Sequence, residues 1–130
     1  MSAAGEDDRL DRALAVLERL EPGAPGRVVA NLDGLSEGLA ETVLGFAFAD
    51  VLARPGLDLR TREMLTVAAL TAMGTAPGQL EFHMRAALEV GVTREELVEV
   101  VLQMAVYAGV PACMNGIAAL KAALEAGDSG

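Results

Sequence analysis

His83 is the only histidine in the 130-residue chain, and it lies in the stretch QLEFHMRAALEVGV. Histidine gains and loses a proton near neutral pH, so this residue type suits acid or base chemistry. Residues three and four positions apart are neighbours on a helix, which places His83 on one stripe with Leu80, Met84 and Ala87. We therefore expect His83 to point inward, either as a core side chain bonded to a backbone carbonyl or as an acid–base group in a pocket.

Other chemistries that use histidine or cysteine fit the sequence less well. With one histidine and no second histidine or cysteine nearby, a metal ion would need carboxylates to complete its coordination sphere, so no metal site is predicted. The serines that a catalytic triad would need fall in predicted tails and a predicted helix cap: Ser2, Ser36 and Ser129. Cys113, the only cysteine, is expected in the first turn of the last helix, where a thiolate is stabilised, although lone buried cysteines are usually inert.

The charge of the chain restricts its partners. The formal net charge is −9, which argues against a nucleic-acid surface, because phosphate binding needs clustered Lys and Arg. An anionic small molecule would depend on local cations, and Arg54, Arg60 and Arg62 fall within a short stretch of the sequence.

The elements that must position these residues are predicted to be helices. The sequence has no alternating strand pattern, and it is 52% hydrophobic but only 3% aromatic, which suits closely packed helices with small side chains. We predict an all-α domain of five to six helices, with the Pro- and Gly-rich segment 21–34 as a connector. The first three predicted helices are residues 6–20, residues 36–53 and residues 58–74. The second of these starts at a capping Ser36 and ends before the break at Pro55 and Gly56. The last three are the His83 helix, which ends at a left-handed Gly91, a helix opened by the capping box of Thr93 and Glu96, and a helix after Pro111.

Length and the absence of targeting patterns bound the organisation of the chain. A length of 130 residues fits one domain. The N-terminus is acidic where a signal peptide would be positive, and no apolar run approaches the roughly 18 residues that span a bilayer, so we expect a cytoplasmic protein without a membrane partner. Such a hydrophobic small chain has more apolar surface than one core hides, which predicts a homo-oligomer.

Three spaced motifs connect the chain to a known family. They are Arg54-Pro55-Gly56-Leu57, then His83-x-Arg85-Ala86 followed by Gly91-Val92-Thr93, and Tyr107-Ala108-Gly109-x-Pro111-Ala112. In order and spacing they resemble the γ-carboxymuconolactone decarboxylase family, which is related to the alkylhydroperoxidase D family, from about Val28 to Leu124. The resemblance implies a single compact domain with the alkylhydroperoxidase D-like helical fold at residues 28–126, preceded by a helix and connector at 1–27 and followed by a tail at 127–130.

The resemblance separates two branches of chemistry. The peroxidase relatives use a CxxC pair a few residues before the matching histidine, whereas this chain has Ala76-Pro77-Gly78-Gln79 there. Disulfide exchange needs two thiols, so peroxidase activity is not expected. The resemblance implies instead a carboxy-lyase without a cofactor, which removes CO2 from γ-carboxymuconolactone or a related lactone in aromatic catabolism.

The same resemblance suggests roles for particular residues. His83 is expected to donate the proton to carbon or to the lactone oxygen, with burial and a neighbouring carboxylate controlling its protonation. Arg54, Arg62 and Arg85 are candidates to hold carboxylates, because the guanidinium fork matches them, although one could pair instead with Glu63, Glu81 or Asp50. Asp50 and Glu63 are possible bases, and Glu63 lies near a functional glutamate of the peroxidase relatives. Tyr107 could line the pocket or lie in the core, and Cys113 is a further candidate lining residue.

Two alternatives stay open. The chain has Phe48 and Leu52 where decarboxylases of this type often have tryptophans, and it has nine arginines to one lysine, a bias that suggests a GC-rich genome. Both observations favour a natural-product tailoring enzyme that acts on a larger substrate by decarboxylation, dehydration or another proton transfer. The other alternative is a catalytically silent helical scaffold. The resemblance also suggests that the oligomer is a trimer or hexamer.

Overall fold

The computed structural model describes residues 2–129, with side chains described for residues 8–127. Within these residues the chain forms seven α-helices and one π-helical segment, and no strand is present. The prediction of an all-α protein is confirmed, but seven α-helices exceed the predicted five to six. The helices are α1 (Ser2–Leu20), α2 (Pro25–Leu35), α3 (Leu39–Leu44), the π-helical η1 (Gly45–Leu52), α4 (Leu59–Met73), α5 (Pro77–Glu89), α6 (Arg94–Ala108) and α7 (Val110–Ser129).

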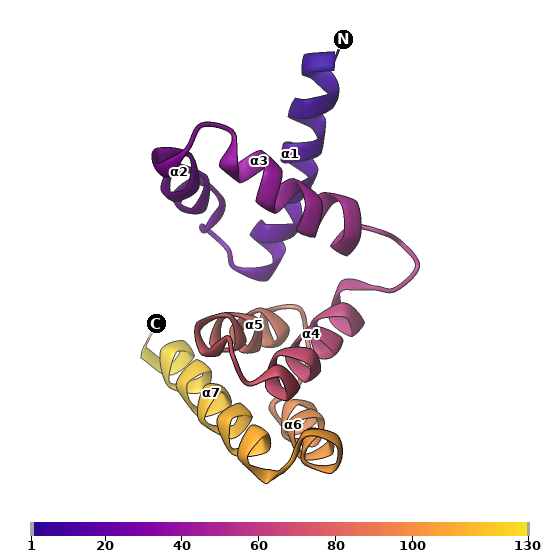
Figure 1. Cartoon of the computed structure of the whole chain (residues 1–130), viewed down its shortest axis with the longest axis vertical. Coiled ribbons are helices and arrows are strands. Elements are labelled where there is room, and N and C mark those ends of the chain that lie inside the picture. The colour runs from indigo at the N-terminus through magenta and orange to yellow at the C-terminus, as the bar shows by residue number, and fades with distance from the viewer. Residues whose placement is uncertain (1, 130) are drawn as a thin grey trace. The chain divides into compact units, whose positions relative to one another are not determined.

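The internal contacts divide the chain into two compact units, and the boundary lies between Leu59 and Arg60 in the first turn of α4. The N-terminal unit contains α1, α2, α3 and η1. The C-terminal unit contains the rest of α4 with α5, α6 and α7 (Figure 1). Among the described residues, no helix is long and apolar enough to cross a membrane.

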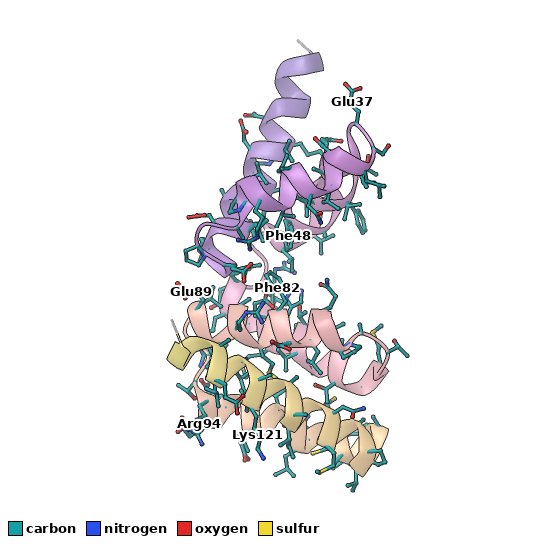
Figure 2. The ribbon with its side chains drawn as sticks, turned by 90° about the vertical axis from the view of Figure 1, so that its left-hand side faces the viewer. Glu37, Phe48, Phe82, Glu89, Arg94 and Lys121 are labelled. Carbon is teal, nitrogen blue, oxygen red and sulfur yellow. The ribbon has the colours of Figure 1, made fainter. Side chains whose placement is uncertain are left out.

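The N-terminal unit packs α1 against α3 and η1. The leucines of α1 recur at helical spacing, and Leu17 and Leu20 are 2% and 1% exposed. On η1, Phe48 is also buried (Figure 2). The apolar stripe of α1 therefore forms the core of this unit, as its sequence period predicts.

The segment predicted to be a connector contains a helix, so that prediction is wrong. α2 begins at Pro25, and a proline fits the first turn because its missing N–H would have no helical partner there. Val28, Val29 and Leu32 follow at helical spacing and are half-buried. The apolar residues override the Pro and Gly content of the segment.

Ser36 does not cap the next helix, contrary to the prediction. It ends α2 instead, where its N–H donates to the Leu32 carbonyl. The chain then turns through Gly38 at φ +83°, and α3 starts only at Leu39. The Asp33 carboxylate accepts a hydrogen bond from the Ala40 N–H at 2.9 Å, so Asp33 supplies the cap that was expected from Ser36. The predicted helix 36–53 is thus shorter at its start, and its second half is π-helical.

The C-terminal unit encloses its own apolar core. Its buried members come from all four helices and from the turn between α5 and α6: Val67, Leu80, Met84, Ala87, Val92, Leu97, Val101, Leu120 and Ala123. α7 packs against α5 and α6. A Cβ on Gly116 would lie 2.8 Å from Val101 Cγ1 and 3.0 Å from Thr71 Cγ2, so only glycine permits this close approach. Charged side chains such as Arg94 and Lys121 lie on the outside of the unit (Figure 2).

The sequence signals for the boundaries of α5 and α6 are confirmed. Gly91 follows α5 with φ +99°. At the start of α6, the Glu96 N–H donates to Thr93 Oγ1 at 3.0 Å and the Thr93 N–H donates to Glu96 Oε1 at 2.9 Å, which completes the capping box. Arg60 binds the same Glu96 carboxylate and the Gly91 carbonyl, which ties the start of α4 to this corner.

Candidate functional site

His83 is bonded to a carboxylate inside the C-terminal unit. Its ring nitrogen Nδ1 lies 2.9 Å from Oε2 and 3.1 Å from Oε1 of Glu63. The side chains are 11% and 0% exposed. The stripe predicted for His83 is confirmed, since Leu80, Met84 and Ala87 are all buried with it. The partner of the ring is a side-chain carboxylate, so the alternative of a ring bonded to a backbone carbonyl does not hold.

The two helices that carry the pair explain its geometry. Glu63 lies in the first half of α4, one turn before the core residue Val67, and His83 lies at the centre of α5 between Leu80 and Ala87. A buried carboxylate needs a charged or hydrogen-bonding partner, which the ring supplies. When Glu63 is ionised it accepts the Nδ1 hydrogen, and proton exchange is then left to the second ring nitrogen, Nε2.

Phe82 connects His83 to Arg85. The Phe82 and His83 rings meet edge to face, with centroids 4.8 Å apart and an interplanar angle of 79°. The Arg85 guanidinium carbon lies 6.0 Å from the centroid of the Phe82 ring, at the outer limit of a cation–π contact. Sequence reasoning overlooked Phe82, although its i, i+3 spacing to Arg85 was an available signal.

Arg85 and Arg62 are the candidate arginines of this unit. Arg85 Nη1 donates to Glu81 Oε1 at 3.2 Å, so the helix-surface pair considered from the sequence is present. Arg62 directly precedes Glu63 on α4, and its side chain is half-buried. The helices that carry the His83–Glu63 pair thus carry these two guanidinium groups in addition to that of Arg60, which binds Glu96.

Asp50 belongs to an ion-pair cluster in the N-terminal unit. Arg9 Nε and Nη2 donate to its two carboxylate oxygens at 3.1 and 2.9 Å, and Arg9 Nη1 reaches Glu41 at 2.5 Å. The hydrogen bonds that Arg9 donates lower the pKa of Asp50, and these bonds to Asp50, with those to Glu41, raise the pKa of Arg9. The partner of Asp50 is Arg9, a residue that was not among the sequence candidates.

Arg54 lies in the N-terminal unit, after η1. Its side chain is exposed and lines a hollow of about 400 Å³ together with Arg19 of α1. Arg19 was also missed from the sequence, because it is far from the RPGL motif along the chain.

Tyr107 and Cys113 differ in exposure. Tyr107 is 79% exposed, so the alternative of a core tyrosine does not hold. Its neighbour Val106 is 76% exposed as well, which shows that this end of α6 presents apolar surface. Cys113 is a free thiol, 5% exposed, in the first turns of α7.

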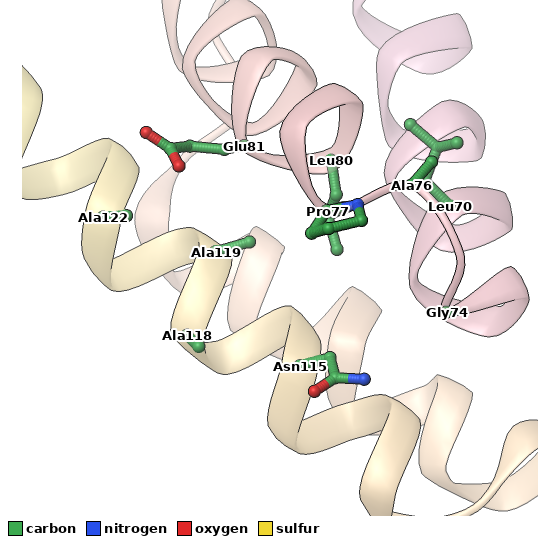
Figure 3. Close-up of a pocket in the computed structure, with 10 residues that line it drawn as sticks. All are labelled: Leu70, Gly74, Ala76, Pro77, Leu80, Glu81, Asn115, Ala118, Ala119 and Ala122. Carbon is green, nitrogen blue, oxygen red and sulfur yellow. The ribbon is translucent and has the colours of Figure 1, made fainter.

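A second hollow of about 320 Å³ lies between the end of α4, the start of α5 and one face of α7 (Figure 3). Its walls are mostly apolar, and its polar side chains are Glu81 and Asn115. The residues that line it include neither His83 nor any lysine or arginine. This hollow is therefore poorly suited to a carboxylate ligand. In the described part of the chain, no three His, Cys, Asp or Glu side chains converge as metal ligands would.

Comparison with known proteins identifies relatives of this chain. The chain is 38% identical over 86 residues to 4-carboxymuconolactone decarboxylase of Acinetobacter baylyi, which covers 66% of this chain and 63% of the relative. It is 38% identical over 77 residues to nitrosuccinic acid decarboxylase npaB of Metarhizium robertsii, or 59% of this chain and 53% of the relative. An uncharacterized 15.0 kDa protein of Paracoccus denitrificans is 38% identical over 71 residues, or 54% of this chain and 53% of the relative.

The matches thus span between half and two thirds of the relatives' own lengths. The sequence model of the carboxymuconolactone decarboxylase family matches residues 37–122, about two thirds of the chain. This chain belongs to the carboxymuconolactone decarboxylase family.

Proposed function

We propose that the chain is a decarboxylase without a cofactor that acts on γ-carboxymuconolactone or a related lactone carrying a carboxylate, with His83 as the proton donor. The observation that carries this proposal is the buried contact between His83 and Glu63. Two relatives of similar identity are named as decarboxylases, which supports the reaction class.

Decarboxylation places two demands on the protein. The bond between a ring carbon and the carboxylate carbon breaks, CO2 leaves, and the electron pair passes through the unsaturated lactone to its carbonyl oxygen. The carbon then takes up one proton, which comes finally from solvent. The enzyme must therefore stabilise an oxyanion and deliver a proton to carbon.

The His83–Glu63 pair supports the second demand. With Nδ1–H donated to Glu63, the ring is held in one tautomer and orientation, and its Nε2 carries the proton that is exchanged. We therefore assign proton donation to His83 and positioning of the ring to Glu63, rather than a separate role as base.

The arginines support the binding of the substrate. Arg62 and Arg85 lie on the helices that carry the pair, and Arg85 is linked to the His83 ring through Phe82. Arg85 would exchange its contact with Glu81 for a substrate carboxylate. Arg54 is a further candidate, in the N-terminal unit. Tyr107 and Cys113 stay candidate lining residues, whereas the ion pair with Arg9 removes Asp50 from our scheme.

The test is CO2 release from γ-carboxymuconolactone by the purified full chain, with nitrosuccinic acid as a second substrate. Saturable CO2 release from the lactone is the expected result. A relative named for nitrosuccinic acid favours a second candidate function, a tailoring decarboxylase on the same scaffold. Turnover of nitrosuccinic acid without turnover of the lactone would select that candidate. CO2 release from neither substrate would remove the lactone assignment and favour a silent scaffold.

We also propose that the chain forms a homo-oligomer in the cytoplasm, through the outer face of α6. Val98, Leu102 and Val106 recur every four residues there, at 43%, 55% and 76% exposed. Contiguous apolar side chains of this kind mark interaction sites. Leu102→Glu should reduce the mass in sedimentation toward that of the 13.4 kDa chain, whereas Lys121→Glu, a matched change at an exposed polar site of α7, should not. An unchanged mass in the Leu102 variant would exclude this face.

A further inference from the structure

The hollow beside Arg54 lies between the end of α1 and the loop that follows η1. Its volume is about 400 Å³, which is within the range of pockets that hold small organic molecules. Arg19, in the last turn of α1, and Arg54, in the loop, both line it. Two guanidinium groups from elements more than thirty positions apart in the sequence thus meet at one cavity.

The charge of this hollow is opposite to that of the chain. The whole chain has a formal net charge of −9, but the lining of the hollow contains two arginines and one carboxylate, Asp58. An excess of positive charge inside a concave wall attracts and orients an anion more effectively than the same charges on an open surface. The fork of a guanidinium group binds a carboxylate through two parallel hydrogen bonds.

The remaining walls are apolar. Val16, Leu52, Pro55, Leu57 and Leu59 line the hollow. Apolar walls with a few polar groups are typical of sites for small organic molecules, because the walls bury the body of the ligand and the polar groups fix its orientation. A bare inorganic anion would leave these walls unused.

We propose that this hollow is a binding site for a small organic carboxylate with an apolar body, whose carboxylate groups are held by Arg19 and Arg54. The proposal shares Arg54 with the proposed function, but it concerns binding alone and does not require decarboxylation. It adds Arg19, which no motif of the sequence indicates, as a determinant of affinity.

Calorimetric titration of the full-length protein with adipate, a six-carbon dicarboxylate, tests the proposal. We expect saturable binding that weakens about tenfold or more in Arg19→Gln, because a hydrogen-bonded charge contact is lost. Arg19→Lys should recover part of the affinity. Arg12→Gln, a matched change at an exposed position of the same helix, should bind as the wild type does, and circular dichroism checks the fold of each variant.

Other outcomes would overturn the proposal. Absence of saturable binding would do so, as would equal weakening in Arg12→Gln and Arg19→Gln, which would indicate only a general charge effect. The neutral six-carbon analogue 1,6-hexanediol should bind far more weakly than adipate. Inorganic phosphate that binds as tightly as adipate would contradict the part assigned to the apolar walls.

A His83→Gln variant separates this proposal from the proposed function. It should bind adipate with wild-type affinity even where CO2 release is lost. Adipate binding in a protein that turns over neither decarboxylase substrate would sink the proposed function and leave the binding site standing. Turnover of a decarboxylase substrate without Arg19-dependent binding of adipate would overturn the binding site and leave the proposed function standing.

Discussion

The two units of the chain each contain a tightly bonded group of charged side chains, and the groups differ in exposure. In the N-terminal unit, the Arg9, Glu41 and Asp50 side chains are 28%, 31% and 42% exposed. In the C-terminal unit, the Glu63 side chain is 0% exposed and the His83 side chain 11%. Solvent screens the first group, so its ion pairs contribute little to stability. The second group carries a desolvation cost that an apolar pair would avoid.

This difference separates a structural contact from a candidate site. Arg9 lies across Gly45, where a Cβ would meet its guanidinium at 2.5 Å, and it joins α1 to α3 and η1. Such a cluster fixes the arrangement of helices. A buried titratable pair is not needed for that purpose, because the apolar core of the C-terminal unit already joins its four helices. The buried pair of His83 and Glu63 is therefore the candidate for chemistry.

The largest effect is expected from a pair of matched Glu→Gln changes. Glu63→Gln removes the charge that holds the His83 ring, and we expect kcat to fall on the order of 10²–10⁴-fold. Glu41→Gln makes the same change in the exposed cluster and should leave kcat nearly unaltered. CO2 release measures both. Equal kcat values in the two variants would contradict the assignment of a catalytic role to the buried pair and a structural role to the exposed cluster.

A smaller effect on stability is expected from two glycines. Gly116→Ala forces a Cβ against the branched side chains of Val101 and Thr71, and we expect a loss of about 1–3 kcal/mol in the free energy of unfolding. Gly127→Ala, on the same helix, meets nothing within 4 Å and should stabilise the helix slightly. Urea denaturation measures both. Gly45→Ala should cost less than Gly116→Ala, since the flexible Arg9 can move aside.

The sequence predicted the C-terminal unit better than the N-terminal unit, for physical reasons. The end of α5 at Gly91 and the capping box of Thr93 and Glu96 are local signals, and both are confirmed. In the N-terminal unit, the cap that Ser36 was expected to supply comes from Asp33, seven positions before its partner Ala40. Propensity could not show that Pro25 begins a helix, because packing of the following apolar residues decides it.

The candidate site was predictable only in part. The stripe of His83 followed from helical spacing, but the sequence did not identify the partner of its ring, which depends on how α4 meets α5. The sequence offered Glu63, Glu81 and Asp50 only as possible partners of an arginine. The structure brings Glu63 to His83 and engages Glu81 with Arg85 and Asp50 with Arg9. Residues distant in sequence that line one hollow, such as Arg19 and Arg54, leave no local sequence pattern from which this could be predicted.

The smallest effect is expected from Glu96→Gln, on the thermal stability of the protein at acidic pH. Hydrogen bonds from Arg60 and Thr93 lower the pKa of Glu96 from its ordinary 4.5 to about 2. A carboxylate whose folded pKa is depressed contributes stability above its unfolded pKa, and that contribution is lost as the pH falls toward 2. Tm measured across this window should fall less steeply in Glu96→Gln than in the wild type. Parallel curves of Tm against pH for the two proteins would show that the ionised Glu96 does not contribute to stability.

The most direct test of the central claim is the rate of CO2 release by His83→Ala beside the wild type, on whichever substrate the wild type turns over. Circular dichroism confirms that each protein is folded, and Arg27→Gln, at an exposed surface position, serves as a control. We predict that activity is lost in the His83 variant and retained in the control. Equal activity in His83→Ala and the wild type would remove His83 from the mechanism and return it to a structural role.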